Sequence, residues 1–284
     1  MKVLVIGATG MLGNAMIRVL SEKPDWQVFG TSRSESSKQL FNSNIAKHLF
    51  SNVDVEQCDT LIEVFNQIHP DIVINCVGLI KQLDDGKNPL QAISINALFP
   101  HRLAKLCELI GARMIHIGTD CVFLGDKGDY RESDLPDAKD IYGVSKYLGE
   151  VAYKHTVTLR TSIIGHELQS ANGLVAWFLS QQGHCKGYTK AIFSGLPTVV
   201  LAQIICYYVI PDPGLSGTYH IGAQSISKYD LLKSIACVYK KQIQIIPDEK
   251  IVINRSLNSE RFKEATGYIV PEWPSLIDTM YFYK

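Results

Sequence analysis

The sequence lacks an excess of charge of either sign, a long apolar run and a low-complexity tract. Its 28 Lys and Arg residues match 28 Asp and Glu residues, so no overall electric field attracts nucleic acid or an anionic membrane. The most apolar stretch, residues 199–210, contains Gln203 and is too short to span a bilayer. We therefore expect neither nucleic acid nor a membrane as a partner.

A paired-cysteine motif is also missing. The seven cysteines are an odd number, and no two of them form a CxxC pair. Several lie in apolar stretches, where a free thiol packs as a small hydrophobic group. This usage predicts a reducing compartment, with no disulfide framework and no metal site. Because the first apolar run ends at Gly7, the N-terminus lacks the pattern of a secretory signal, and we expect a cytoplasmic protein.

Short β-branched runs alternate with segments of helical periodicity through residues 1–165. Strand–helix–strand units of this kind form parallel sheets. The sequence therefore predicts an α/β fold, a doubly wound Rossmann sheet with a smaller C-terminal lobe. The expected elements are strands 2–6, 26–33, 71–78, 113–119 and 157–165, and helices 11–20, 61–68, 90–110 and 141–154.

Beyond residue 165 the alternation loosens, and Gly and Pro become frequent. We interpret residues 1–165 as a dinucleotide-binding domain and residues 166–284 as a smaller substrate-binding lobe. Some segments of that lobe are expected to return to the core sheet. Its expected elements are helices 174–182, 198–209 and 228–240, and strands 218–221 and 243–246.

Three glycines in "VIGATGMLG" (residues 5–13) are spaced three apart, between a predicted strand and a predicted helix. Glycine lets the backbone approach a pyrophosphate closely, and the N-terminus of the following helix attracts the anion. This setting predicts a dinucleotide-binding turn, with glycines that merely allow close packing as the alternative. The residues expected to contact the cofactor are Gly7, Thr9, Gly10, Met11, Leu12 and Gly13.

The end of the second strand indicates which dinucleotide is bound. Chains that bind NAD carry an acidic residue there for the ribose diol, whereas this chain has Ser32 and Arg33. A hydroxyl followed by a guanidinium suits a 2′-phosphate, which favours NADPH over NADH; a solvated loop cation is the alternative. The other expected groove residues follow a further short strand that we expect just before residue 54 and end the strand 71–78: Asp54, Val55, Cys76, Val77 and Gly78.

Tyr142 and Lys146 in "YGVSK" are four residues apart on a predicted helix, so they share one face. A nearby ammonium lowers the pKa of a phenol, which lets tyrosine exchange a proton nearer neutral pH. The lysine can also bind the nicotinamide ribose. Thr119 follows a core strand, where α/β sheets place ligands, and its hydroxyl can polarise a substrate carbonyl.

With these motifs, residues 1–165 resemble an extended short-chain dehydrogenase/reductase. "IGTDCVFLGDKGDYRESD" followed by "YGVSKYLGE" is similar to the dTDP-4-dehydrorhamnose reductase group, as are "LRTSIIG" and "RSLNSERFKEATGY". The resemblance implies that Thr119, Tyr142 and Lys146 form a catalytic triad. It also implies that Asn96 helps to order the lysine and a water relay.

Position 121 departs from the pattern of that group, which has tyrosine there. Related sugar-nucleotide 4,6-dehydratases have glutamate, so water elimination lacks an obvious base in this chain. A cysteine two residues after the catalytic hydroxyl resembles GDP-fucose synthase, which implies that Cys121 can deprotonate a carbon beside a ketone. His166 or His184 would then be the partner acid. Passive packing of the cysteine is the alternative.

Substrate contacts are expected mainly from the C-terminal lobe. Aromatic side chains stack on a base or sugar, and cations neutralise a diphosphate. Residues 175–198 contain both kinds, although a core-facing helix with a solvated basic loop would give the same pattern. The predicted substrate-binding residues are Lys81, Thr119, Cys121, Trp177, Lys190 and Arg255.

The sequence thus predicts an NADPH-dependent reductase of a nucleotide-linked 4-keto-6-deoxy sugar, serving polysaccharide precursor synthesis and forming a homodimer. NADH is the alternative cofactor. One alternative function is a bifunctional epimerase/reductase that uses Cys121. Another is a non-catalytic NADP-binding regulatory subunit, because the regulatory β-subunit of methionine adenosyltransferase is related to this reductase group.

Overall fold

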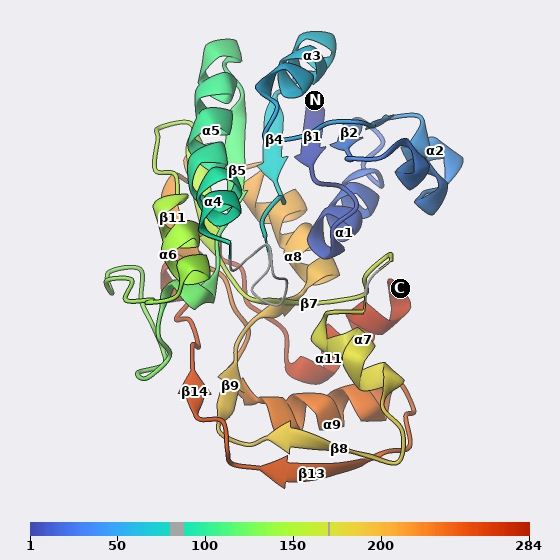
Figure 1. Cartoon of the computed structure of the whole chain (residues 1–284), viewed down its shortest axis with the longest axis vertical. Coiled ribbons are helices and arrows are strands. Elements are labelled where there is room, and N and C mark those ends of the chain that lie inside the picture. The colour runs from blue at the N-terminus through green and yellow to red at the C-terminus, as the bar shows by residue number, and fades with distance from the viewer. Residues whose placement is uncertain (80–87, 170) are drawn as a thin grey trace.

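The computed structural model describes residues 1–79, 88–169 and 171–284. A parallel sheet of seven strands forms its centre (Figure 1), which confirms the predicted doubly wound α/β fold. In spatial order the strands are β11 (Gly217–His220), β6 (Thr156–Arg160), β5 (Arg113–Ile117), β4 (Ile72–Asn75), β1 (Lys2–Ile6), β2 (Gln27–Thr31) and β3 (Leu49–Phe50).

Strand β1 lies at the point where the strand order reverses. It pairs in parallel with β2 on one side and β4 on the other, so Val3 lies beside both Val28 and Ile72. Ligands of open α/β sheets bind at the carboxyl ends of strands next to such a reversal. The topology therefore directs attention to the loops that follow β1, β2, β4 and β5.

Two cores lie on opposite faces of the sheet. Residues of β1 alternate between them, with Val3 and Val5 on one face and Leu4 and Ile6 on the other. The first face packs against α1 (Met11–Leu20), α8 (Thr198–Ile204) and α11 (Trp273–Phe282). The second packs against α3 (Cys58–Ile68) and α5 (Phe99–Ile110). Burial on both faces explains why the strands are continuously apolar.

The helix expected over residues 90–110 consists of three pieces. A short α4 (Pro89–Gln91) leads into a π-helical segment, η3 (Ala92–Leu98), and then into α5. Pro100 is the cause, because it has no backbone donor and its ring displaces the carbonyl four residues earlier, that of Asn96. Wider helical turns accommodate that displaced carbonyl.

Two other expected elements are shorter than predicted. Helix α6 (Ile141–Leu148) ends before residue 154, at Gly149, where a Cβ would lie 1.9 Å from the Asn96 carbonyl oxygen. The strand expected over 157–165 divides into β6 and a two-residue β7 (Ile163–Ile164). Three short elements complete the first half of the chain: η1 (Glu35–Leu40), α2 (Ser43–Ala46) and η4 (Asp120–Val122).

Residues after 165 contribute to both halves of the molecule. Strand β11 adds to the central sheet beside β6, and α8, which continues into the π-helical η5 (Ile205–Val209), packs on α1. Six of the remaining segments lie in the lower half of Figure 1: α7 (Leu174–Ser180), β8 (His184–Tyr188), β9 (Ala191–Phe193), α9 (Lys228–Val238), β13 (Gln244–Asp248) and β14 (Ile253–Asn254). The others are β10 (Leu196–Pro197), which pairs with β7, β12 (Ile226–Ser227), which pairs with β9, and α10 (Glu260–Thr266), which packs on β11.

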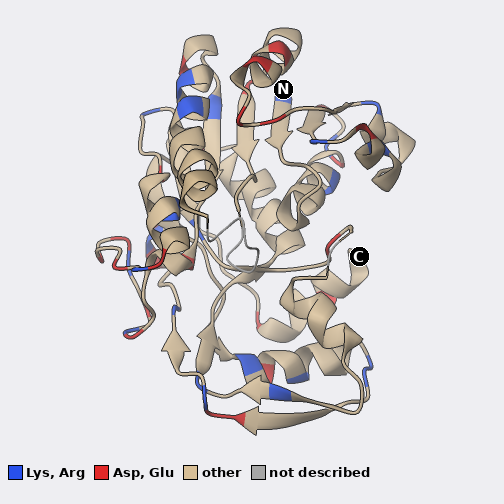
Figure 2. Ribbon diagram, in the orientation of Figure 1, with Lys and Arg blue, Asp and Glu red and all other residues tan. Residues whose placement is uncertain are grey.

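Basic and acidic segments are interspersed along the ribbon, as Figure 2 shows. Within residues 1–79, 88–169 and 171–284, no helix has the length and apolar character that crossing a membrane requires. The same ranges contain no group of three or more His, Cys, Asp or Glu side chains arranged to hold a metal ion.

Candidate active site

The glycine turn between β1 and α1 has almost no room for side chains. Gly7 has a positive φ of 82°, and a Cβ there would lie 2.7 Å from Val77 Cγ2. A Cβ at Gly13 would lie 2.0 Å from the Gly7 carbonyl oxygen. Gly10 begins α1 and no side chain caps the helix, so the N–H groups of the first turn remain available to an anion.

The end of β2 is tied to this turn. The Gly7 N–H donates to Thr31 Oγ1 at 3.1 Å, and the Ala8 N–H donates to the Thr31 carbonyl at 2.9 Å. Ser32 is buried and its hydroxyl donates to the Ser34 carbonyl at 3.1 Å. Arg33 is exposed and has no hydrogen bond or ion pair in the described part of the chain. Of the two residues expected at a 2′-phosphate, Arg33 is therefore the one with unused donors.

The other predicted groove residues divide into two groups. Asp54 closes the turn before α3, because its carboxylate accepts the Glu56 N–H at 3.0 Å, and the neighbouring Val55 packs on the core. Cys76 and Gly78 follow β4 and lie against Lys146: a Cβ at Gly78 would be 3.5 Å from Lys146 Nζ. Burial raises the pKa of the Cys76 thiol to about 12. The end of β4 thus connects the predicted cofactor groove to Lys146.

Thr119 and Tyr142 come together where η4 meets α6. Thr119 caps η4 by accepting the Cys121 N–H at 3.2 Å, and its hydroxyl donates to Asp120 Oδ1 at 3.3 Å. Tyr142 is near enough for the same hydroxyl to act on the pKa of its phenol. Helix α6 approaches closely because position 143 is glycine: a Cβ there would lie 2.4 Å from the Cys121 carbonyl oxygen. Asp140 caps α6 by accepting the Gly143 N–H at 3.0 Å.

The pKa of Tyr142 differs from the sequence-based expectation. Burial raises it above the ordinary tyrosine value, and nearby Cys121 and Asp120 act in the same direction. The nearby Thr119 hydroxyl partly opposes this rise in the pKa. The expected lowering by Lys146 is not found, since removing water from the phenol has the larger effect. Tyr142 is therefore a protonated acid at neutral pH.

Lys146 is almost completely buried beneath this pair. Its side chain is 6% exposed, and its ammonium donates to the Ile117 carbonyl at 3.0 Å. Burial lowers the pKa of Lys146 to about 8, against the opposing effect of Glu150. Lys146 consequently titrates close to physiological pH.

Asn96 links two segments of the site by hydrogen bonds from its side chain. Its Oδ1 accepts the Leu79 N–H at 2.9 Å, and its Nδ2 donates to Ser145 Oγ at 3.3 Å. The Ser145 hydroxyl in turn donates to the Tyr142 carbonyl at 3.0 Å. Asn96 thereby connects the segment after β4 to α6. The expected water relay through it stays a prediction.

Arg255 brings the C-terminal half of the chain to the site. Its Nε donates to the Phe123 carbonyl at 2.7 Å, and its Nη1 lies 3.8 Å from Cys121 Sγ. Burial nevertheless raises the pKa of the Cys121 thiol to about 12, with Asp120 adding to the effect. Cys121 and Arg255, predicted separately for substrate binding, are thus in contact beside Thr119.

The other candidates are not brought into this cluster. Trp177 is on α7 and 39% exposed, and Lys190 pairs with Glu249 at 2.6 Å. His184 is exposed on β8, while His166 Nε2 shares a hydrogen bond with the Tyr239 hydroxyl at 2.8 Å. Substrate roles for these residues stay predictions. Lys81 lies outside the described residues.

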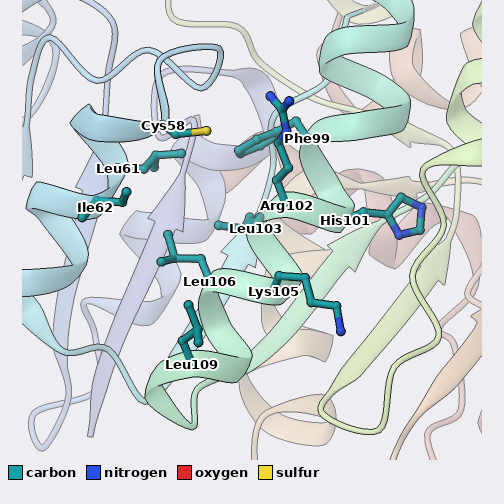
Figure 3. A pocket seen from close by; sticks show the side chains of 10 residues that line it. All are labelled: Cys58, Leu61, Ile62, Phe99, His101, Arg102, Leu103, Lys105, Leu106 and Leu109. Carbon is teal, nitrogen blue, oxygen red and sulfur yellow. The ribbon is translucent and has the colours of Figure 1, made fainter.

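A groove of about 380 Å³ lies between α3 and α5 (Figure 3). Apolar side chains of both helices face it, and it shares no residue with the cluster around Tyr142. It does not coincide with the candidate active site. Its lining is Cys58, Leu61, Ile62, Phe99, His101, Arg102, Leu103, Lys105, Leu106 and Leu109.

Comparison with known proteins identifies the family. Residues 1–280 match the family model described as RmlD substrate binding domain. The chain belongs to this family. Membership in the RmlD family confirms the resemblance to the dTDP-4-dehydrorhamnose reductase group that the motifs indicated, and classes the chain as an oxidoreductase of the extended short-chain dehydrogenase/reductase type.

Two relatives and one solved structure illustrate the match. The chain is 29% identical over 236 residues to the probable low-salt glycan biosynthesis reductase Agl14 of Haloferax volcanii. The matched region covers 79% of this chain and 75% of that protein. It is 24% identical over 268 residues to methionine adenosyltransferase 2 subunit beta of Xenopus laevis (88% and 76% covered). A dTDP-4-dehydrorhamnose reductase from Bacillus anthracis, in complex with NADP, shares the fold with a TM-score of 0.80 at 23% identity (100% and 98% covered).

Proposed function

We propose that this RmlD family member is an NADPH-dependent reductase of a nucleotide-linked 4-keto-6-deoxy sugar in polysaccharide precursor synthesis. The observation that carries the proposal is the cluster of Thr119, Tyr142 and Lys146 at the carboxyl end of the sheet. The reductase Agl14 and the NADP-bound dTDP-4-dehydrorhamnose reductase support the reaction class, the coenzyme and the substrate class. NADH is the alternative coenzyme.

The residues present fit a dinucleotide. The turn formed by Gly7, Gly10 and Gly13 exposes backbone at the start of α1, and Arg33, just after β2, offers a guanidinium that has no partner among the described residues. These groups would hold the pyrophosphate and the 2′-phosphate. Bound NADPH would supply the hydride that reduces the ketone.

Side chains of the protein supply the proton that the reduced ketone oxygen takes up. Tyr142, kept protonated by burial, donates to the ketone oxygen as negative charge develops there. The Thr119 hydroxyl would hydrogen-bond the same oxygen and so stabilise the developing alkoxide. The Lys146 ammonium would bind the nicotinamide ribose beside this pair.

The division of labour along the chain is part of the proposal. Residues 1–165 would bind the coenzyme and residues 166–284 the sugar nucleotide. The contact of Arg255 with Cys121 supports this division, because it places a cation of the C-terminal part beside the reacting groups. A cytoplasmic location and a homodimer complete the proposal.

The function is tested by NADPH oxidation with 4-keto-6-deoxy sugars linked to dTDP, UDP, GDP or CDP. At least one should be reduced. The methionine adenosyltransferase beta relatives favour a second candidate, a regulatory subunit that binds NADP without turnover. A thermal shift with NADPH, combined with no oxidation across the panel, would establish that second candidate instead.

Replacement of Arg33 tests the coenzyme. We expect Arg33→Ala to raise the Kd for NADPH about tenfold or more and to leave the Kd for NADH unchanged, because a hydrogen bond to a charged group contributes about 1.5–3 kcal/mol. Fluorescence titration of both coenzymes measures the two constants. Arg131→Ala, which removes another exposed arginine, is the control. Equal losses for NADPH and NADH would contradict a 2′-phosphate contact.

Isotope exchange tests the epimerase alternative. Burial keeps the Cys121 thiol protonated at neutral pH, whereas His166 hydrogen-bonds Tyr239 and His184 is exposed on β8. We therefore expect reduction in deuterated water to leave the carbons beside the ketone free of deuterium, and Cys121→Ser to keep most of the turnover. Mass spectrometry of the product decides. Deuterium that enters with the wild type and disappears with Cys121→Ser would make the protein an epimerase/reductase.

A further inference from the structure

Two charged residues of the quoted motifs have no role in the proposed reaction. Glu150 ends "YGVSKYLGE" and Arg160 belongs to "LRTSIIG". They form a bidentate ion pair, with Arg160 Nε 2.6 Å from Glu150 Oε1 and Nη2 2.7 Å from Oε2. Their side chains are only 5% and 9% exposed. Burying such a pair yields little net stability, so stability alone does not explain it.

The position of Glu150 relates the pair to the active site. It follows Lys146 by four residues, just beyond the end of α6, and Gly149 between them keeps a helical conformation (φ −89°, ψ 0°), so the two residues are about one helical turn apart. The backbone cannot shift there, because Gly149 packs directly on the Asn96 carbonyl oxygen. Lys146 itself forms no ion pair within 4 Å in the described part of the chain. Glu150 is the carboxylate whose charge acts on its ammonium.

The other titratable groups around Lys146 are neutral at pH 7. Burial raises the pKa of Cys76, which follows β4, and of Tyr142 on α6. Burial lowers the pKa of His116 on β5 well below its usual range. The segment η3 contributes no titratable side chain. Glu150 is therefore the one anion acting on the ammonium among the described residues.

Arg160 opposes that anion from the far side. Besides the two bonds to Glu150, its Nη1 lies 3.2 Å from His220 Nε2. Burial and the charge of Arg160 lower the pKa of His220 to about 4, so the imidazole is neutral. The Glu150 carboxylate is thus hydrogen-bonded to the Arg160 cation and acts on the Lys146 cation through its charge.

We propose that Glu150, held in place by Arg160, is a positioning residue that keeps the Lys146 ammonium charged inside its buried site. Arg160 fixes the carboxylate and at the same time limits its effect on the lysine. The inference deepens the proposed reductase function and rests on it for the meaning of turnover. The charge state of Lys146 can be measured without any substrate.

The test is an NMR titration of the full chain labelled with ¹³Cε-lysine, with the Lys146 signal assigned through Lys146→Arg. The wild-type midpoint should lie at about 8. Glu150→Gln removes the anion and should lower the midpoint by about one pH unit, whereas Arg160→Gln removes a cation and should raise it by a similar amount. Opposite shifts from the two partners of one ion pair are not expected if the pair only stabilises the fold.

Further variants keep the test decisive. Glu132→Gln is the control, because Glu132 accepts the His220 N–H at 2.7 Å from another side of the cluster; its midpoint should equal that of the wild type. If Glu150→Gln does not fold, Glu150→Asp should keep the wild-type midpoint while Arg160→Gln still raises it. Unchanged midpoints, or shifts in the same direction for both partners, would overturn the inference.

Turnover separates this inference from the function on which it rests. The upper pH limit for reduction should follow the NMR midpoint, because the charged lysine is needed and is lost as pH rises through its pKa. Midpoints that move as expected while no keto sugar is reduced would refute the proposed function and leave the inference standing. If a keto sugar is reduced but the Lys146 midpoint is the same in all variants, the proposed function stands and the inference about Glu150 is refuted.

Discussion

Tyr142→Phe is expected to lower the rate of NADPH-dependent reduction by about 10²–10⁴-fold, the range of a lost general acid. The phenol is the protonated group beside Thr119, and phenylalanine removes its proton while keeping the ring. Because the glycine turn and Arg33 are untouched, the Kd for NADPH should stay at the wild-type value. Single-turnover kinetics and a fluorescence titration measure the two quantities.

Tyr147→Phe provides the matched control for that variant. Tyr147 is on the same helix, α6, but is 43% exposed, so its hydroxyl should be dispensable for both binding and turnover. A Tyr142→Phe protein that binds NADPH and still reduces its substrate near the wild-type rate would remove Tyr142 from the mechanism. Loss of turnover in both variants would point to disturbance of α6.

The parallel sheet was predictable because its signal is local. Each core strand is a short aliphatic run, and each is followed by a helical pattern, so the doubly wound fold follows from connection rules. Tyr142 and Lys146 could be predicted as neighbours for the same reason, because residues four apart on a helix lie on one face. The short strands β8, β9 and β14 and helices α10 and α11 were not predicted, because they depend on partners distant in sequence.

Electrostatic properties were the least predictable. The spacing of Tyr142 and Lys146 suggested a lowered phenol pKa, yet burial, which spacing does not reveal, raises it. Arg255 could be assigned to a family-like segment, but its contact with Cys121 joins residues 134 positions apart. Likewise Glu150 and Arg160 each stood in a quoted motif, and only the fold shows that they form one ion pair.

Gly13→Ala should have the largest effect on the fold. The added Cβ would lie 2.0 Å from the Gly7 carbonyl oxygen and 2.8 Å from its carbon, both of them backbone atoms that cannot rotate away. Separating β1 from α1 enough to admit a methyl group should cost about 3 kcal/mol of the free energy of unfolding, the upper end for overpacking. We expect thermal unfolding to begin about 6 °C lower or more, together with loss of NADPH binding.

Gly10→Ala separates binding from folding within the same turn. Gly10 has an ordinary φ of −69°, and its Cβ would meet only the Gly7 carbonyl oxygen, at 3.5 Å. The variant should therefore unfold at the wild-type temperature. The new methyl group would stand at the start of α1, where a pyrophosphate must approach the backbone, so the affinity for NADPH should fall at least about tenfold. If Gly10→Ala binds NADPH as the wild type does, the glycines only allow β1 and α1 to pack closely, and the coenzyme binds elsewhere.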